Sequence, residues 1–376
     1  MRLAVIGVGH LGRHHARVVA GLEGVTLVAV ADSRIDQARA VAEPLGAEAV
    51  ADYRDLLDRV DAVSIAVPTF LHREVAGAFL ERGIHAMVEK PLASTLPQAE
   101  ELVELARRSG ATLQVGHIER FNPALAALEA ARLRPKYISA VRSGTYTFRS
   151  TDIGVVLDLM IHDIDLILSL NRSEVTSVEA MGVSIFGQHE DVANARIRFA
   201  DGCIADLTAS RASFAASRTM RLWGAEGYAT VDFAAKTTTI VRPGERLRRG
   251  ELDVSGVDLT QPAAVREHLF NKVLRVDKVQ AEGREPLALE LEDFVRAIHG
   301  GTSPTVSGDD GLKAIRVADA VLRSLRAHAW EGTSEGPVGP FDLPEPVAGP
   351  IVDLAGPMLF RYPRVKQAAP TDAERS

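Results

Sequence analysis

The chain has a single cysteine, no long hydrophobic run and no excess of positive charge, and each absence excludes a class of protein. With Cys203 alone, there is no internal disulfide, no cysteine-based zinc site and no sign of an oxidising compartment. No stretch approaches the roughly 18 consecutive apolar residues of a membrane span. The start, MRLAVIGVGHLG, is too short and too glycine-rich for a signal peptide. Because Lys and Arg number 43 against 50 Asp and Glu, we expect no general nucleic-acid binding. With no signal peptide expected and one cysteine, we expect a cytoplasmic location by default.

The length of 376 residues and the hydrophobic content of 46% predict two ordinary domains with real cores. In the first domain, short apolar runs alternate with amphipathic segments. The runs have the β-branched composition of buried parallel strands and lie at residues 3–7, 25–31, 62–67, 84–89 and 112–116. Helical spacing occupies residues 34–45, 70–82 and 95–109. The alternation predicts an α/β Rossmann domain, a doubly wound parallel sheet, over residues 1–120.

The pattern then changes to that of an α+β domain, which we place at residues 121–330. A half-exposed strand is predicted at 137–148 and a helical segment at 155–170. Further strand candidates are separated by Gly, Asp and Asn turns: SVEAMGVSIF, ANARIRFA, CIADLTAS, TMRLWG and TVDFAAKTTTIV. We expect an antiparallel sheet with one covered face, followed by helices at 286–299 and 309–327.

The last segment, residues 331–376, is a Pro/Gly-rich tail that holds eight of the 18 prolines. Such a composition cannot form long regular elements. Its apolar clusters, IVDL and MLFRY, fit a segment that drapes over a surface, for example that of a neighbouring subunit. A disordered tail is an equal alternative.

A G-x-G-x-x-G motif, formed by Gly7, Gly9 and Gly12, lies between the first predicted strand and a helix. These glycines allow a tight turn, close approach of a pyrophosphate and close helix–strand packing. Glycines also serve ordinary turns, but Asp32 ends the second strand, where a carboxylate would bind the adenosine ribose. The combination predicts dinucleotide binding. Asp32 favours NAD because its charge repels a 2′-phosphate, while Arg34 leaves NADP as the minor alternative.

Two further segments carry candidate catalytic groups. Lys90 follows a predicted core strand at the edge where ligands bind, although a lysine there is equally consistent with a solvated charge. On a helix, Asp158, His162 and Asp165 would share one face, as a general base and its carboxylates would. A salt-bridged amphipathic helix explains the same spacing. A metal site is disfavoured because a third ligand cluster is missing, so we expect no metal.

The segment GHIERFNP at 116–123 follows the last strand of the first domain, again on the ligand side. Arg120 and Asn122 suit a phosphate or sugar hydroxyls. They are equally consistent with a polar linker before a helix, so these two residues alone decide nothing.

Together these motifs resemble the glucose–fructose oxidoreductase / inositol dehydrogenase family (Gfo/Idh/MocA). The resemblance is carried by GVGHLG at 7–12, AVPTFLH at 66–72, EKPLA at 89–93, and Asp158 with His162, and it spans roughly residues 1–327. It implies a Rossmann domain, a second domain with a large open, mostly antiparallel sheet, and reversible hydride transfer between a nicotinamide and a sugar-like alcohol. It places the family's catalytic residues at Lys90, Asp158 and His162, and it implies a cis peptide bond between Lys90 and Pro91.

The resemblance also implies the residues that contact the cofactor. They are Gly7, Gly9, His10, Leu11, Gly12, Asp32, Arg34, Pro68, Thr69, His72, Glu89 and Lys90. In the mechanism we infer, His162 removes the proton of the substrate hydroxyl and Lys90 stabilises the developing alkoxide, with Asp158 orienting or charging the pair. Whether His162 or Lys90 is the base stays open at this point.

Within the family, four stretches are similar to sugar-nucleotide dehydrogenases: GHIERFNPA, FRSTDIGVVLDLMIHDIDLIL, LALELEDFVRAI and PTVSGDDGLKA. We therefore expect a UDP-linked N-acetylhexosamine that is oxidised at the 3-hydroxyl of the ring. The candidate substrate contacts are Arg120, Asn122, Arg149 and Asp165, with Arg142 as a further cation for the diphosphate. The alternatives are a dehydrogenase of a free sugar or inositol, and a non-catalytic NAD-binding sensor or scaffold. We expect a homo-oligomer, either a dimer or a tetramer.

Overall fold

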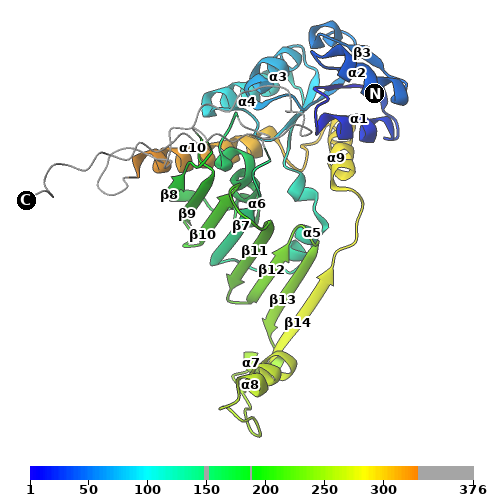
Figure 1. Cartoon of the computed structure of the whole chain (residues 1–376). Coiled ribbons are helices and arrows are strands. Elements are labelled where there is room, and N and C mark those ends of the chain that lie inside the picture. Colours follow the sequence, from blue (N-terminus) through cyan, green and yellow to red (C-terminus); the bar gives the residue numbers. More distant parts are fainter. Residues whose placement is uncertain (148–151, 187–188, 329–376) are drawn as a thin grey trace, which may run out of the picture. The chain divides into compact units, whose positions relative to one another are not determined.

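A computed structural model describes residues 1–147, 152–186 and 189–328 of the chain and contains the two predicted sheets (Figure 1). The predicted tail, residues 331–376, and Arg149 lie outside the described residues. Among the described residues, no helix combines the length and the apolar character that crossing a bilayer requires.

The first sheet has six strands in the order β3-β2-β1-β4-β5-β6, all parallel. Its strands are β1 Arg2–Ile6, β2 Thr26–Ala31, β3 Glu48–Val50, β4 Ala62–Ile65, β5 His85–Glu89 and β6 Leu113–Gly116. The five predicted strands are confirmed. Strand β3 was not predicted because three residues are too few to show a period. The strand order reverses between β1 and β4, which is where a doubly wound sheet binds its ligand.

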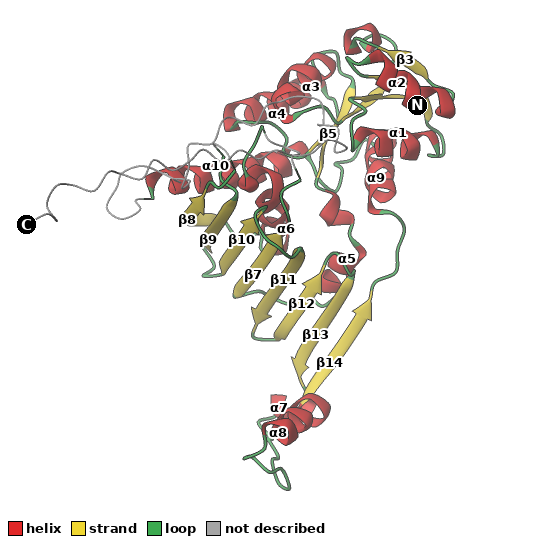
Figure 2. Ribbon diagram, viewed as in Figure 1, coloured by secondary structure: helices red, strands yellow, loops and turns green. Residues whose placement is uncertain are grey.

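Helices cover this sheet, as Figure 2 shows. They are α1 Gly12–Ala20, α2 Ile35–Ala42, α3 His72–Leu80 and α4 Leu96–Ser109. The interior is aliphatic: Leu3, Ala4 and Val5 of the central strand are each 0% exposed. Continuous burial of successive residues is expected for a parallel strand that is covered on both faces. It explains why these strands were visible in the sequence as uninterrupted apolar runs.

The second sheet has eight strands in the order β14-β13-β12-β11-β7-β10-β9-β8 (Figure 1). Its strands are β7 Tyr137–Ser143, β8 Val175–Val183, β9 Val192–Phe199, β10 Ile204–Ser210, β11 Ser217–Gly224, β12 Gly227–Asp232, β13 Thr237–Pro243 and β14 Leu274–Gln280. Only β7 and β10 pair in parallel, and every other neighbouring pair is antiparallel. Buried and more exposed residues alternate along β9 and β11, so this sheet has one covered face.

Two expectations for the second domain were wrong in detail. TVDFAAKTTTIV is two strands rather than one, because the chain reverses between β12 and β13 through a turn in which Lys236 has φ +54°. Strand β14 and the short helices α7 Glu245–Arg248 and α8 Pro262–His268 were not predicted. All residues of α7 and α8 are at least partly exposed, so neither helix shows the apolar stripe by which helices are found in a sequence.

The remaining helices are α5 Pro123–Ala130, α6 Ile161–Leu170, α9 Pro286–Gly300 and α10 Gly308–Ala327. Helix α9 follows the second sheet in sequence but packs Leu287, Leu291 and Phe294 into the core cluster of Leu3 and Val5. Helix α10 begins at a capping box between Ser307 and Asp310 and contacts β8, α4 and α6. Because the chain returns to the first sheet, the boundary at residue 120 stays a prediction.

Candidate active site

The glycine loop between β1 and α1 has the shape that a dinucleotide requires. Gly7 adopts φ +81°, and a Cβ there would lie 2.8 Å from Val67 Cγ1. A Cβ on Gly12 would lie 1.8 Å from the carbonyl oxygen of Gly7, so only glycine allows α1 to begin this close to the strand. A Cβ on Gly9 would meet nothing within 4 Å, which leaves the outer side of the loop open for a pyrophosphate. The loop therefore fits the cofactor.

Asp32, just beyond the end of β2, is fixed beside this loop. Its carboxylate accepts hydrogen bonds of 3.0 Å from the backbone N–H groups of Val8 and Arg34. Gln37 donates a 2.6 Å hydrogen bond to the carbonyl of Val8 and so holds the loop from the other side. The Arg34 guanidinium is 3.8 Å from the Asp32 carboxylate and remains largely exposed. Asp32 is thus held beside the glycine loop, and its contact with the adenosine ribose stays a prediction.

The segment after β4 is joined to the segment after β5 by His72. Its Nδ1 is 2.8 Å from the carbonyl oxygen of Pro91, and its Nε2 is 3.0 Å from that of Val67. Burial lowers the pKa of this imidazole. Thr69 is also buried, and Pro68 precedes it at the start of the same turn. The histidine therefore connects two loops at the ligand edge of the sheet.

Glu89 belongs to a buried polar chain that the sequence did not reveal. Its Oε1 is 2.9 Å from His15 Nε2, and His15 Nδ1 is 2.8 Å from the hydroxyl of Ser64. Burial alone would raise the pKa of Glu89, but the hydrogen bond to His15 and the charge of Lys90 bring it below its usual value. His15 and Glu89 are 74 residues apart, and no local pattern connects them.

Lys90 lies between the first sheet and the segment of the second domain that contains Asp158. Its ammonium donates hydrogen bonds to the carbonyl oxygen of Asp158 at 2.7 Å and to the Asp158 carboxylate at 3.0 Å. Both side chains are mostly buried, with 14% and 21% of their surface exposed. The peptide bond between Lys90 and Pro91 is cis, as the resemblance implied. An ammonium has three donors, so one N–H remains for a substrate oxygen.

Asp158 lies in a π-helical turn, Val156–Met160, and His162 is the second residue of α6, the α-helix that follows. Such turns are rare and occur often at functional sites. His162 has a buried Nδ1 with no hydrogen-bond partner among the described residues. The centroids of its ring and the His117 ring are 6.4 Å apart. Burial and then the charges of Lys90 and Arg142 lower the pKa of His162 well below 6.5. The imidazole is therefore neutral at pH 7 and able to accept a proton.

The carboxylates of this helix bind cations rather than His162. Asp165 accepts hydrogen bonds of 2.7 and 3.0 Å from Arg120, and both side chains are largely buried. Asp163, which follows His162 in the sequence, accepts hydrogen bonds of 3.2 and 3.0 Å from Arg142. The expected carboxylate–histidine pair is thus replaced by ion pairs, because buried carboxylates need a cationic partner.

Arg142 and Asn122 are held by one buried carboxylate, Glu119. Arg142 is 3% exposed and donates a 2.8 Å hydrogen bond to Glu119. Asn122 donates a 2.9 Å hydrogen bond to the same carboxylate, and it caps α5 by accepting from the N–H of Ala124. The roles of Arg120, Asn122 and Asp165 toward a substrate stay predictions, with these internal contacts already made.

A second missed group lies on α9. Glu290 is 0% exposed, and neither carboxylate oxygen has a hydrogen-bond partner among the described residues. Gln114 of β6 donates a 2.9 Å hydrogen bond to the backbone carbonyl of Glu290. Burial, then the nearby negative charge of Glu89, raises the pKa of Glu290 well above 4.5. Burial therefore favours the protonated form of Glu290. In the sequence it looks like an ordinary polar residue of an amphipathic helix.

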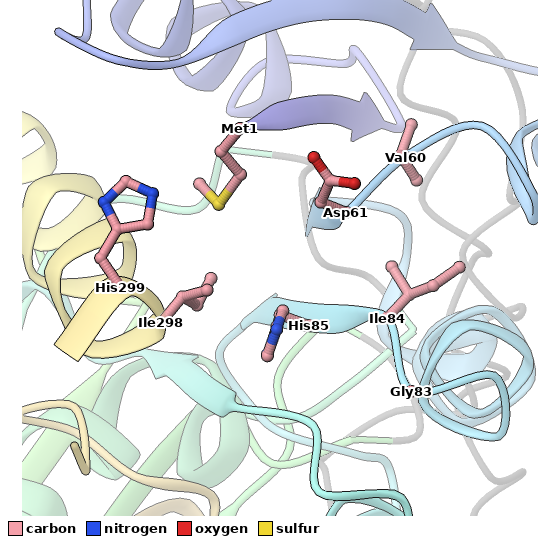
Figure 3. Close-up of a pocket in the computed structure, with 8 residues that line it drawn as sticks. All are labelled: Met1, Val60, Asp61, Gly83, Ile84, His85, Ile298 and His299. Atoms are coloured by element: carbon pink, nitrogen blue, oxygen red, sulfur yellow. The ribbon is translucent and has the colours of Figure 1, made fainter. Parts of the chain in front are cut away.

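A hollow of about 500 Å³ lies at the opposite edge of the first sheet (Figure 3). It is lined by residues that precede β1, β4 and β5, among them Met1 and Asp61, and by His299 of α9. Asp61 pairs with Arg2 at 2.7 Å, and the ring of His85 accepts a hydrogen bond from the N–H of Thr112. Because ligands of parallel sheets bind at the carboxyl ends of strands, this hollow is not the active site. Within the described ranges, no three His, Cys, Asp or Glu side chains gather as a metal site would require.

Comparison with known proteins places this architecture in a family. Residues 1–117 match the oxidoreductase family with an NAD-binding Rossmann fold, and residues 126–230 match the GFO/IDH/MocA C-terminal domain. UDP-N-acetylglucosamine 3-dehydrogenase from Acidithiobacillus ferrooxidans is 36% identical over 328 residues, which are 87% of this chain and 98% of that protein. Its solved structure has a TM-score of 0.76 at 35% identity and covers 86% of this chain and 97% of its own. Myo-inositol 2-dehydrogenase from Thermotoga maritima is 27% identical over 344 residues, which are 86% and 96% of the two chains.

The chain therefore belongs to the Gfo/Idh/MocA oxidoreductase family. The expected fold, with a Rossmann domain and a mostly antiparallel second sheet, is confirmed. The expected class of enzyme, an NAD(P)-dependent oxidoreductase, is also confirmed.

Proposed function

We propose that the enzyme oxidises the 3-hydroxyl of UDP-N-acetylglucosamine with NAD as the acceptor. The observation that carries this proposal is the 36% identity to UDP-N-acetylglucosamine 3-dehydrogenase over 98% of that relative. The resemblance implies that Lys90, Asp158 and His162 are catalytic. In support, Lys90 is hydrogen-bonded to Asp158, and its charge contributes to the lowered pKa of His162 after burial.

His162 is the residue we assign as the general base. Its pKa is lowered well below 6.5 by burial and by the positive charges of Lys90 and Arg142, so it is ready to take the hydroxyl proton at neutral pH. Lys90 instead holds a cationic ammonium against the carboxylate of Asp158 at 3.0 Å. A protonated amine cannot accept a proton, which favours His162 over Lys90 for this role.

Lys90 then acts as the electrostatic partner of the substrate oxygen. Two of its three N–H donors are fixed by Asp158, so the third is directed by the fold and needs little reorganisation to meet a developing alkoxide. Asp158 orients Lys90 and balances its charge. The nicotinamide, when bound, accepts the hydride from the carbon that bears this oxygen.

NAD is the cofactor we propose, in preference to NADP. Asp32 is anchored by the N–H of Val8 and lies beside the glycine loop. A 2′-phosphate in this position would meet a fixed negative charge, whereas a ribose hydroxyl can donate to it. Arg34 is exposed nearby and is the group that would bind NADP if the preference were reversed.

A second candidate function is the oxidation of a free inositol or sugar. The observation that favours it is the 27% identity to myo-inositol 2-dehydrogenase over 96% of that relative. A non-catalytic NAD-binding sensor is weaker, since a sensor does not need Lys90, Asp158 and His162 together. We expect a homo-oligomer, a dimer or tetramer, in the cytoplasm, and light scattering of the full chain tests the assembly.

The experiment that tests the function is product identification. The purified enzyme is incubated with UDP-N-acetylglucosamine and NAD, NADH formation is followed by absorbance, and the product is examined by mass spectrometry and NMR. We expect loss of two hydrogen atoms and a ketone at ring position 3. A ketone at another carbon contradicts the position, and no NADH with any UDP-sugar contradicts the substrate class.

A further inference from the structure

We propose that Arg218 of β11 binds the phosphate groups of the substrate. This inference rests on the proposed function and extends it, because it names a residue that would distinguish a sugar nucleotide from a free sugar. Arg218 was not among the residues singled out in the sequence. The strand predicted there, TMRLWG, begins one residue after it.

The strand register places Arg218 on the same face of the sheet as the catalytic helix. In the antiparallel pair of β11 and β7, Arg218 is directly opposite Arg142. Met220 and Leu222, which alternate in phase with Arg218, are 0% and 1% exposed and form the covered face. From that same face, Arg142 reaches Asp163 of α6 at 3.0 Å. Arg218 therefore points to the side of the sheet that carries α6.

Arg218 differs from the other cations of the site in having no carboxylate within ion-pair distance among the described residues. Arg142 is paired with Glu119 and Asp163, Arg120 with Asp165, and Lys90 with Asp158. The Arg218 side chain is exposed and has no hydrogen-bond or ion-pair partner in the part of the chain that the structure describes. In a protein of net charge −7, an unbalanced arginine on the catalytic face is suited to an anionic ligand.

The charge of Arg218 also reaches the catalytic groups. Burial is the largest cause of the lowered pKa of His162. The charges of Lys90, Arg142 and His117 come next, and that of Arg218 also contributes. Burial raises the pKa of Asp163, the residue that follows His162, and the charge of Arg218 opposes this rise. A diphosphate attached to the sugar must lie within a few bonds of the reacting ring, so its cation should lie near the base but not on it. A planar guanidinium provides bidentate donors that match phosphate oxygens.

The cofactor's own phosphates are expected to bind elsewhere. The pyrophosphate of a dinucleotide is expected at Gly7 to Gly12, on the first sheet, whereas Arg218 belongs to the second sheet. A defect in Arg218 should therefore change substrate affinity and leave NAD affinity unchanged. NAD affinity is then an internal check that the variant has folded.

Arg221 provides a matched control on the same strand. It is exposed like Arg218, but it is opposite Ser139 and alternates out of phase with Met220 and Leu222, on the other face of the sheet. The substitutions Arg218→Gln and Arg221→Gln remove the same charge from the two faces. Arg218→Lys keeps the charge but removes the bidentate geometry.

The test is calorimetric titration of UDP into the NAD-loaded wild type and the three variants, together with KM for UDP-N-acetylglucosamine. We expect Arg218→Gln to raise both the Kd for UDP and KM roughly ten- to hundredfold, Arg218→Lys to give a smaller rise, and Arg221→Gln to match the wild type. Equal UDP affinity in Arg218→Gln and wild type overturns the role of Arg218 alone. A wild type that does not bind UDP overturns this role and the sugar-nucleotide function together. A parallel loss in Arg221→Gln reveals a general charge effect and also overturns the assignment.

Discussion

The ammonium of Lys90 is 2.7 Å from the carbonyl oxygen of Asp158 and 3.0 Å from its carboxylate. This contact joins the carboxyl end of β5, in the cofactor-binding sheet, to the π-helical turn that leads into His162. One side chain thereby connects the sheet of the NAD-binding domain to the turn that precedes His162, the base that we propose. Correct placement of reacting groups accounts for a large share of enzymatic rate enhancement.

Removal of either reacting side chain should abolish most turnover. We expect Lys90→Ala and His162→Ala each to lower kcat roughly 10²–10⁴-fold, the usual contribution of a positioned acid, base or electrostatic group. Titration of NAD should give nearly the wild-type Kd, which separates the chemical defect from misfolding. Near-native turnover in either variant would assign that residue a structural role only.

The pH dependence of oxidation should reflect a neutral histidine. Because the pKa of His162 is lowered well below 6.5, the base form persists as the pH falls through 6.5. We expect the acid limb of kcat/KM for oxidation to lie below pH 6.5, and the reverse reduction, which needs the protonated form, to speed up as pH falls. A pH–rate profile between pH 5 and 9 measures both limbs. An acid limb at or above pH 6.5 would show that the environment does not depress this pKa.

Cofactor choice should depend on Asp32. The carboxylate, held by the N–H groups of Val8 and Arg34, repels a 2′-phosphate, so NAD should bind more tightly than NADP. Asp32→Ser should raise the Kd for NAD and lower the Kd for NADP, because Arg34 is left without its anionic neighbour. Fluorescence titration of both cofactors measures this change. Tighter binding of NADP by the wild type would mean that Arg34 governs the pocket.

The buried acid Glu290 should make stability fall as the pH rises. A folded-state pKa raised above its unfolded value means that the folded chain keeps a proton that the unfolded chain releases, so the fold loses up to about 1.4 kcal/mol per pH unit above about pH 4.5. The penalty grows until the pH reaches the raised pKa of Glu290, where the folded chain also ionises. The Glu290→Gln substitution removes this pH-dependent penalty. The variant should therefore melt at a higher temperature than the wild type at pH 7.5, with little difference at pH 4.5.

The control for this prediction lies two residues further along α9. Glu292 is paired with Arg284, and that contact lowers its pKa. Glu292→Gln should therefore give no rising gain in melting temperature between pH 4.5 and 7.5. A Glu290→Gln variant that follows the wild type at every pH would show that Glu290 is ionised in the folded protein.

The groups that could be predicted are those whose signal is local. The glycines at positions 7, 9 and 12 are required by backbone contacts within one turn, and Asp32 and Lys90 follow apolar runs that end at a known ligand edge. Carboxyl ends of parallel strands converge, so separate motifs could be brought to one site without a structure.

The partners of these groups could not be predicted because they are distant in sequence. Lys90 and Asp158 are 68 residues apart, and Arg120 and Asp165 are 45 apart. Helical spacing suggested that the carboxylates would serve His162, but ion pairing with arginines from other elements decides their orientation. No local pattern singles out Arg218 or Glu290. Their significance comes from the face of a strand and from complete burial, which only the folded chain defines.

The most direct test of the account compares kcat/KM for three substrates with NAD: UDP-N-acetylglucosamine, free N-acetylglucosamine and myo-inositol. The account predicts the highest value for UDP-N-acetylglucosamine, by at least about tenfold, since a phosphate held by a charge-assisted contact contributes about 1.5–3 kcal/mol. A higher kcat/KM for myo-inositol or for the free sugar would contradict the sugar-nucleotide function and favour a polyol dehydrogenase.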